Sequence, residues 1–360
     1  MGSASVQLFG APASPYTRKM VSLLRYRQIP YEIHWGDATA QLLARGVEPP
    51  KPALLPTFLF RKDNPSLPYL GEGEPVARCD STPIIRLLEQ CYEARSVIPE
   101  DPALRFLDYL IEDFADEWGT KYMFHYRWYD QLDIENAGTL LPLMIDPSLD
   151  PATHEAFKKA FSERQVSRLY VVGSTPSTAP IIDASYERFL AALSRVLEER
   201  LFLFGARPSA ADFALFGQLS QCVGMDPTPR QLTHDMAPRV VAWVQLLEDL
   251  CGLQPQSENW LDRDSVAERL KPLLEEIGRV YVPALLTNAR AYEEEEKTWS
   301  TQIDGAKWEQ RTFPYQAKCL RWIREEFAAL NDADRRWVYD LIESVAASAL
   351  LSEESQTSSS

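Results

Sequence analysis

The turn Ser14-Pro15-Tyr16-Thr17 is the first group of residues whose types and spacing could do chemistry. It has the outline of Cys-Pro-Tyr-Cys with hydroxyls in place of both sulfurs, and it precedes a helical pattern. A helix N-terminus offers unpaired backbone N–H groups and a positive dipole end, which stabilise an anion such as a thiolate. The Ser14 hydroxyl can donate a hydrogen bond to a ligand thiolate, or it can only cap the helix. Without a histidine nearby in sequence, Ser14 is a poor nucleophile, and without cysteines at 14 and 17 disulfide exchange is disfavoured.

A second candidate is Leu55-Pro56, which directly precedes the apolar stretch Thr57–Phe60. Proline is out of place at a strand that looks central, but a cis bond in a tight turn would explain it. Such a turn exposes the N–H and C=O of Leu55, which can pair with an extended peptide ligand. An ordinary trans-proline at the start of a strand is the alternative.

The third candidate is Asp80-Ser81 at the start of a helical pattern. The Asp80 carboxylate can bind an ammonium group, and Ser81 with the helix N-terminal N–H groups can bind a carboxylate. The amino-acid end of a peptide carries both charges, although a simple helix cap fits the pair as well. Taken together, the three motifs predict a groove for a small peptide, with its amino-acid end at Asp80-Ser81, its backbone at Leu55 and its thiol near Ser14.

The elements that must position these motifs form an α/β unit with the order βαββ(β)α. The pattern predicts a strand at Val6–Gly10, a helix from Tyr16 to Gln28, and strands at Tyr31–Trp35 and Thr57–Phe60. An edge strand within residues 64–77 and the helix after Asp80 complete the unit. A strand-helix-strand crossover of this length suits a parallel pair.

Beyond Pro99 the chain changes to long helices, among them an apolar segment at residues 209–224 that should be buried on all sides. From about residue 254 we expect helices interrupted at Pro272 and Pro283, a hairpin at Asp304-Gly305 and two terminal helices. The predicted domains are an α/β domain at 1–97, an all-α domain at 98–253 and an extension at 254–350 packed on it, followed by a disordered tail at 351–360.

Composition narrows the classes of partner. The formal net charge is −15, from 37 basic and 52 acidic residues. This balance argues against nucleic acid and anionic membranes as partners, while a local basic pocket for an anionic ligand stays open. Five widely spaced cysteines and four histidines show no zinc-site spacing, so we expect no metal. No apolar run is long enough for a membrane helix, and no signal peptide is recognisable. We therefore expect a cytoplasmic location.

With these motifs in place, the sequence resembles the glutathione S-transferase family. The run "SPYTRKMVSLLRYRQIPYE" is similar to the start of its serine-type or cysteine-type branches. Independently, "FGARPSAADFALFGQL" carries Gly205, Ser209 and Asp212, which match the capping box that opens the central helix of the family's α-helical domain. The resemblance covers roughly residues 6 to 250. The sequence departs from the family pattern in four places. These are an apparent insertion at about 135–180, the Asp-Ser pair in place of Glu-Ser, a long connection before Cys79 and the C-terminal extension.

The resemblance implies a thioredoxin-like, glutathione-binding first domain and glutathione as co-substrate. The implied glutathione-binding residues are Ser14, Leu55, Pro56, Asp80 and Ser81, with Ser14 as the catalytic group. The aromatic run after Glu117 offers Trp118, Tyr122, His125, Tyr126 and Trp128 for a hydrophobic electrophile, although core packing fits them too. The predicted electrophile pocket comprises Tyr16, Trp118, Tyr122, His125 and Tyr126.

A glutathione-dependent transferase that activates the thiolate is thus the leading interpretation, with a homodimer as a family expectation. A non-catalytic binding or scaffolding protein on the same fold is the alternative, which the long extension favours.

Overall fold

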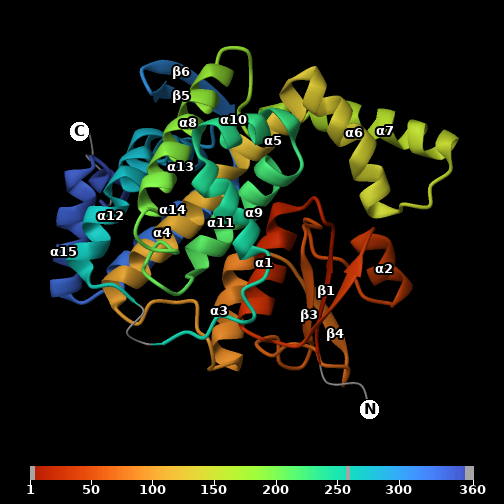
Figure 1. Cartoon of the computed structure of the whole chain (residues 1–360), viewed down its shortest axis with the longest axis horizontal. Helices are drawn as coiled ribbons and strands as arrows, with labels where there is room; N and C mark the ends of the chain where they lie inside the picture. The colour runs from red at the N-terminus through yellow and green to blue at the C-terminus, as the bar shows by residue number, and fades with distance from the viewer. Residues whose placement is uncertain (1–4, 257–259, 353–360) are drawn as a thin grey trace.

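A four-stranded mixed sheet forms the core of the first domain (Figure 1). The computed structural model describes residues 5–256 and 260–352. The strand order is β2 (Tyr31–Trp35), β1 (Val6–Gly10), β3 (Thr57–Arg61) and β4 (Pro75–Arg78). β1 and β2 run parallel, whereas β3 is antiparallel to both β1 and β4. All four strands lie where the sequence predicts them.

Three helices accompany the sheet: α1 (Pro15–Tyr26), α2 (Ala38–Ala44) and α3 (Ser81–Cys91). Helices α1 and α3 were predicted, and each begins at a candidate motif. Helix α2 was missed because it is short and only two of its residues are buried, so it leaves no clear apolar period. Its N-terminus is capped by Asp37, which accepts a hydrogen bond from the Ala40 N–H.

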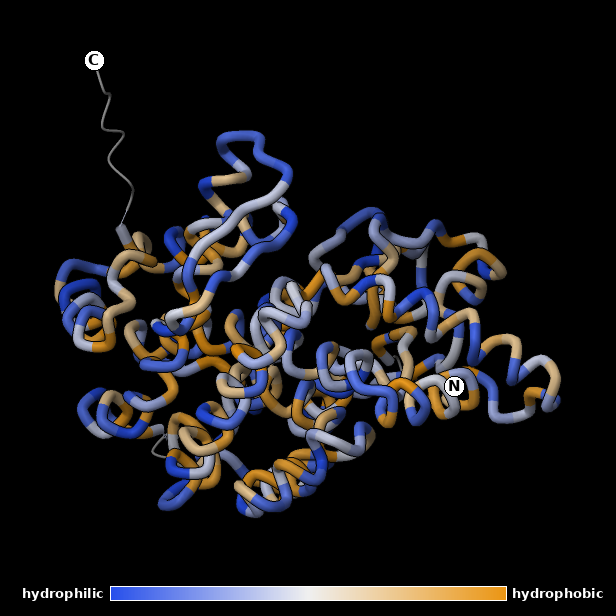
Figure 2. Tube along the Cα trace, turned by 90° about the horizontal axis from the view of Figure 1, so that it is seen from above, coloured by the Kyte–Doolittle hydropathy of each residue, from blue (hydrophilic) through white to orange (hydrophobic). Residues whose placement is uncertain are grey.

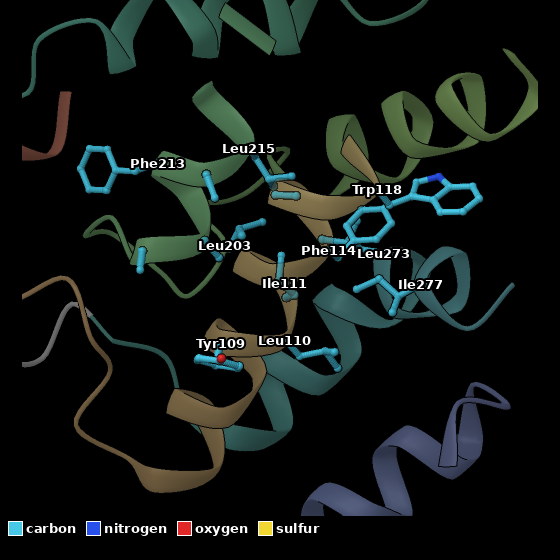
Figure 3. Packing of buried hydrophobic residues seen from close by; sticks show 14 of the residues in the cluster. Tyr109, Leu110, Ile111, Phe114, Trp118, Leu203, Phe213, Leu215, Leu273 and Ile277 are labelled. Atoms are coloured by element: carbon cyan, nitrogen blue, oxygen red, sulfur yellow. The ribbon is translucent and has the colours of Figure 1, made fainter. Parts of the chain in front are cut away.

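The helical body surrounds α4, whose buried side chains pack against α9 and α12 (Figure 3). Its elements are α4 (Pro102–Glu117), α5 (Gly119–Tyr129), α6 (Gln131–Ile145), α7 (Pro151–Val166), η1 (Leu169–Val171), α8 (Ala179–Val196), α9 (Ala210–Gly224), α10 (Pro227–Met236) and α11 (Pro238–Leu247). Helix α9 is buried along its whole length except Gly224, which confirms the central buried helix. In its capping box, Asp212 accepts hydrogen bonds from the N–H and hydroxyl of Ser209.

Helix α1 joins the two parts by packing tightly on α9. The contact depends on Gly217, because a Cβ atom there would lie 2.6 Å from the backbone oxygen of Pro15 and 3.0 Å from Cβ of Lys19. The first turn of α1 is therefore held in direct contact with the helical body.

The C-terminal extension packs on the helical body through α12, which contacts α8, and through α14 and α15, which contact α4. Its elements are α12 (Arg263–Glu276), the π-helical η3 (Ile277–Tyr281), α13 (Val282–Glu293), β5 (Thr298–Ile303), β6 (Ala306–Arg311), α14 (Pro314–Ala328), α15 (Asp332–Ser344) and η4 (Ser348–Leu350). Pro272 lies inside α12, whereas Pro283 is in the first turn of α13. Asp304 and Gly305 form the predicted hairpin turn, and both have the positive φ that such a turn needs. Of the predicted tail, residues 353–360 lie outside the described part.

Helices α6 and α7 form an arm that projects from the helical body on the side of α2 (Figure 1). The tube coloured by hydropathy shows apolar segments gathered between the helices and hydrophilic ones along the outer turns (Figure 2). None of the side chains of α7 is fully buried. Within residues 5–256 and 260–352, no helix is both long and apolar enough to cross a bilayer.

The architecture, an α/β domain of the predicted type followed by an all-α domain with additional helices, confirms the predicted fold class. The residue boundaries of the predicted domains stay a prediction.

Candidate functional site

A cleft of about 520 Å³ lies between the first domain and the arm, which is within the usual size range of small-molecule sites. The first-domain wall comes from the loops that precede α1, α2 and β3. The opposite wall comes from α5, α6 and α7 and consists mainly of apolar side chains: Met123, Phe124, Trp128, Leu141, Met144, Ile145, Phe157 and Phe161.

Ser14 lines the cleft at the N-terminus of α1. Its Oγ accepts a hydrogen bond from the Thr17 N–H at 3.2 Å, so the serine caps the helix. Among the described residues, no acceptor takes the hydrogen of this hydroxyl, which leaves it able to donate to a ligand. Capping and donation use different parts of the same group, so the two interpretations of Ser14 are compatible.

The loop that carries Ser14 is fixed by the helical body. Nη1 of Arg127 donates to the Ala13 carbonyl at 3.0 Å, and Nε2 of Gln221 donates to the Pro12 carbonyl at 3.4 Å. Nε of Arg127 also lies 3.0 and 3.1 Å from the two carboxylate oxygens of buried Asp226. Arg127 therefore holds the loop in place, and its charge is already compensated.

The peptide bond Leu55-Pro56 is cis, as the sequence predicts, and a second cis bond at Lys51-Pro52 was not anticipated. Leu55 lines the cleft, but Pro56 does not. In the described part of the chain, neither the N–H nor the C=O of Leu55 has a hydrogen-bond partner. An extended ligand that lies along this loop can therefore pair with the Leu55 backbone.

Asp80 lies outside the lining of the cleft. It precedes α3 with a φ of +87°, and its side chain makes no cap hydrogen bond. Instead, Oδ2 accepts a hydrogen bond at 3.0 Å from the hydroxyl of Tyr315, at the start of α14 in the extension. Burial raises the pKa of the Asp80 carboxyl, while the Tyr315 hydrogen bond opposes that shift.

Ser81 also lies outside the lining of the cleft, and its side chain is buried among charged groups of the domain interface. Nζ of Lys19 donates to Ser81 Oγ at 3.0 Å, to Glu112 Oε1 at 2.9 Å and to Asp116 Oδ2 at 2.6 Å. Burial alone would lower the pKa of Lys19, but the two carboxylates outweigh it and raise that pKa. The Ser81 hydroxyl thus serves the interface, whereas the Ser81 N–H has no partner within the described residues.

The residues of the predicted electrophile pocket lie away from the lining of this cleft. None of its five residues lines the cleft: Tyr16, Trp118, Tyr122, His125 and Tyr126. The Tyr16 hydroxyl donates to the Asp116 carbonyl at 2.7 Å. Trp118 and Tyr122 share the hydroxyl of Ser185, at 3.2 and 2.8 Å. Trp118 and Tyr122 are therefore buried inside the helical body, whereas half-buried Tyr16 links α1 to it.

The remaining two residues also face this interior. His125 Nδ1 lies 2.7 Å from Oγ of Ser174, and the ring of Tyr126 packs against that of Tyr186. Core packing, the alternative open for the aromatic run after Glu117, accounts for Trp118, Tyr122, His125 and Tyr126, whereas Trp128 of the same run lines the cleft.

The cleft takes its aromatic residues from the opposite face of α5 and from α7. Helix α5 has aromatic residues on both faces, so its pattern does not tell the inner face from the outer one. Phe124 and Trp128 face the cleft, and the Trp128 ring packs on that of Phe161. The available signal was the pair Phe157 and Phe161, one turn apart on an otherwise polar helix.

No group of three or more side chains suited to hold a metal ion is found in residues 5–256 and 260–352. The expectation that the protein needs no metal remains a prediction.

Two family models match the chain. The model for the glutathione S-transferase N-terminal domain matches residues 8–96, and the model for the glutathione S-transferase C-terminal domain matches residues 156–246. No curated protein sequence gives a significant match.

Similar solved structures include three glutathione S-transferases. One is from Methylobacterium radiotolerans in complex with glutathione sulfonate, at 18% identity, 72% coverage of this chain, 99% of that chain and a TM-score of 0.38. One is from Rhodospirillum rubrum F11, at 17% identity, 72% and 98% coverage and a TM-score of 0.41. The Tau class protein of mango, Mangifera indica, has 17% identity, 76% and 100% coverage and a TM-score of 0.40. Because these likenesses are distant, the family assignment rests on the two domain models, which together span half of the chain.

Proposed function

Since the chain belongs to the glutathione S-transferase family, we propose that it binds glutathione in the cleft and stabilises the glutathione thiolate with Ser14. One observation carries the proposal: at the N-terminus of α1, Ser14 lines an apolar cleft with a hydroxyl hydrogen that no described residue takes. The thiolate formed there attacks a hydrophobic electrophile held by the arm.

The proposed chemistry follows from stabilisation of a negative charge. A hydrogen bond from Ser14 and the positive end of α1 both favour the thiolate over the thiol, so they lower the pKa of bound glutathione. The thiol proton leaves to solvent, and the sulfur becomes the nucleophile. The side chains of Phe124, Trp128 and Phe161 line the cleft and exclude water from the bound electrophile. Conjugation, isomerisation and ether cleavage all start from this thiolate, so fold alone does not select among them.

In the proposed peptide groove, the N–H and C=O of Leu55 pair with the central part of the glutathione backbone. At the amino-acid end, Asp80 would bind the ammonium through Oδ1, because Tyr315 occupies Oδ2. The Ser81 N–H, rather than the engaged hydroxyl, would bind the carboxylate. Pro56, next to Leu55, is kept as a proposed contact of glutathione.

Four narrower expectations accompany this proposal: a cytoplasmic location, a homodimer, a hydrophobic small molecule as second substrate, and domain boundaries near residues 97 and 253.

The test compares Ser14→Ala and Ser14→Gly with the wild type. Glycine at an N-cap costs only a few tenths of a kcal/mol, so it removes the hydroxyl with little loss of helix stability. Both variants should still bind immobilised glutathione, but turnover of a chloronitrobenzene should fall by about 100-fold, as when one donor to a developing anion is removed. The pKa of bound glutathione, followed through thiolate absorbance, should rise.

The control is Asp262→Ala, which removes the cap of α12 in the extension. It should lower stability without changing turnover or the thiol pKa. If both Ser14 variants keep wild-type turnover, a donor other than Ser14 stabilises the thiolate.

A non-catalytic binding or scaffolding protein is the second candidate, and the contacts at α3 favour it. There Tyr315 already holds Asp80, and Lys19 already holds the Ser81 hydroxyl. Failure of the wild type to bind glutathione would decide for this candidate.

A further inference from the structure

Arg164 stands out among the charged side chains that line the cleft, which are Asp37, Arg127 and Arg164. Arg127 is compensated by Asp226, and Asp37 caps α2. The Arg164 side chain makes no hydrogen bond or ion pair with any described residue, although the chain has a net charge of −15. Among the described residues that line this cleft, the exposed Arg164 guanidinium is therefore the cation whose charge no side chain compensates.

Helix geometry directs Arg164 to the same side as the aromatic residues. Phe157, Phe161 and Arg164 follow each other at intervals of four and three residues, which puts them on one face of α7. All three line the cleft. A ligand that stacks on Phe161 thus meets the Arg164 guanidinium one helical turn further along.

This arrangement matches a molecule with two unlike ends. The apolar wall suits an aromatic body, whereas a guanidinium binds carboxylates and sulfonates through paired hydrogen bonds. The polar groups on the first-domain wall, among them Ser14, lie across the cleft from α7. An electrophile oriented in this way has its anionic end at the arm and its reactive end toward Ser14.

We propose that the second substrate is an aromatic electrophile that carries an anionic group, and that Arg164 is the residue that recognises this group. The reaction in this inference rests on the proposed function, whereas the binding of an anionic aromatic molecule does not. In the simplest such reaction, the glutathione thiolate attacks the ring carbon that bears chlorine in a chloronitrobenzoate. A carbon–sulfur bond forms, chloride leaves with the electron pair of the carbon–chlorine bond, and the carboxylate stays on Arg164.

The first experiment needs no glutathione. It measures the dissociation constants of anilinonaphthalene sulfonate, which is anionic, and of N-phenylnaphthylamine, its neutral counterpart. The wild type should prefer the anionic dye. Arg164→Gln should weaken the anionic dye by about 2- to 5-fold, the range of an exposed ion pair, and leave the neutral dye unchanged. Arg164→Lys should restore part of the preference.

Two further variants locate the effect. Lys159→Gln removes the same charge from an exposed position of α7 that does not line the cleft, so it should change neither dye. Phe161→Ala should weaken both dyes, because both would stack on this ring. An anionic preference that survives in Arg164→Gln, or dye binding that Phe161→Ala leaves unchanged, would overturn the proposal.

The second experiment compares turnover of chloronitrobenzoate and of neutral chloronitrobenzamide with glutathione. Arg164→Gln should raise KM for the benzoate alone and leave the benzamide as in the wild type. If Arg164→Gln loses the preference for the anionic dye but the wild type turns over neither compound, the result supports the anion site and counts against the proposed function. Turnover with equal use of both compounds would count against the anion site alone.

Discussion

Asp108 is a fully buried carboxyl group of α4 with one satisfied oxygen. Oδ1 accepts the Ala211 N–H at 2.9 Å, whereas Oδ2 has no partner in the described part of the chain. Burial raises the pKa of this carboxyl to about 7, although the charge of Arg86 opposes the shift. A proton on the unpaired Oδ2 removes the cost of a buried negative charge at this position.

The raised pKa makes stability depend on pH. In the unfolded chain Asp108 titrates near ~3.9, so between that pH and about 7 the folded chain holds one more proton at this residue. The contribution of Asp108 to stability is therefore fully present below the unfolded pKa and is lost as the pH rises to about 7. Asp108→Asn keeps the acceptor for Ala211 and cannot titrate.

Urea denaturation at several values of pH between 5 and 8 checks this prediction. The free energy of unfolding of the wild type should fall more steeply with pH than that of Asp108→Asn. Parallel pH profiles of the two proteins would show that Asp108 is ionised throughout.

Among single residues, local signals predicted the motifs but not all of their partners. The cap at Ser14 and the cis bond at Leu55-Pro56 follow from neighbouring residues, and both occur. The contacts of Ser81 with Lys19 and of Asp80 with Tyr315 join residues far apart in sequence, so no local pattern announces them.

Elements were predicted well where one period dominated. The strands have clear apolar patterns and α9 is apolar on all sides, whereas α5 is aromatic on two faces, so its pattern did not tell which of its aromatic residues line the cleft. The arm was recognised only as an insertion, because its contribution to a cleft depends on where the folded chain places it.

The contact of α1 with α9 gives a prediction at this scale. Gly217→Ala puts a methyl group 2.6 Å from a backbone oxygen of α1, which has little room to yield. We expect a loss of stability of about 1–3 kcal/mol, as for other overpacked contacts. Because α1 carries Ser14, affinity for glutathione should fall as well. Urea denaturation and calorimetric titration with glutathione measure the two effects.

Gly224→Ala is the matched control, since this glycine ends the same helix and, its own helix backbone and chain neighbours aside, no described atom lies within 4 Å of the added carbon. It should be neutral or slightly stabilising. Equal effects of the two substitutions would mean that helix propensity, and not the contact with Pro15, accounts for the change.

At the scale of the whole molecule, the extension reaches back to the first domain through Tyr315 and Asp80. The Tyr315 hydroxyl fixes the carboxylate that we expect to bind the glutathione ammonium. Tyr315→Phe removes the hydroxyl and keeps the ring. Affinity for glutathione should fall by about 2- to 10-fold, the worth of one hydrogen bond at a partly exposed site, as measured by calorimetric titration.

Tyr292→Phe offers a comparison, because Tyr292 is an exposed tyrosine of α13 whose hydroxyl has no partner within the described residues. Its affinity for glutathione should equal that of the wild type. Tighter binding by Tyr315→Phe would show instead that the extension competes with the ligand for Asp80.

The two walls of the cleft come from separate stretches of chain. Ser14 and Leu55 belong to the first domain, whereas much of the opposite wall lies within Gln131–Val166. A library of variants restricted to that stretch would therefore sample new substrate ranges without changing a residue on the wall that carries Ser14. The molecule thus separates the part that selection can vary from the part that it must keep.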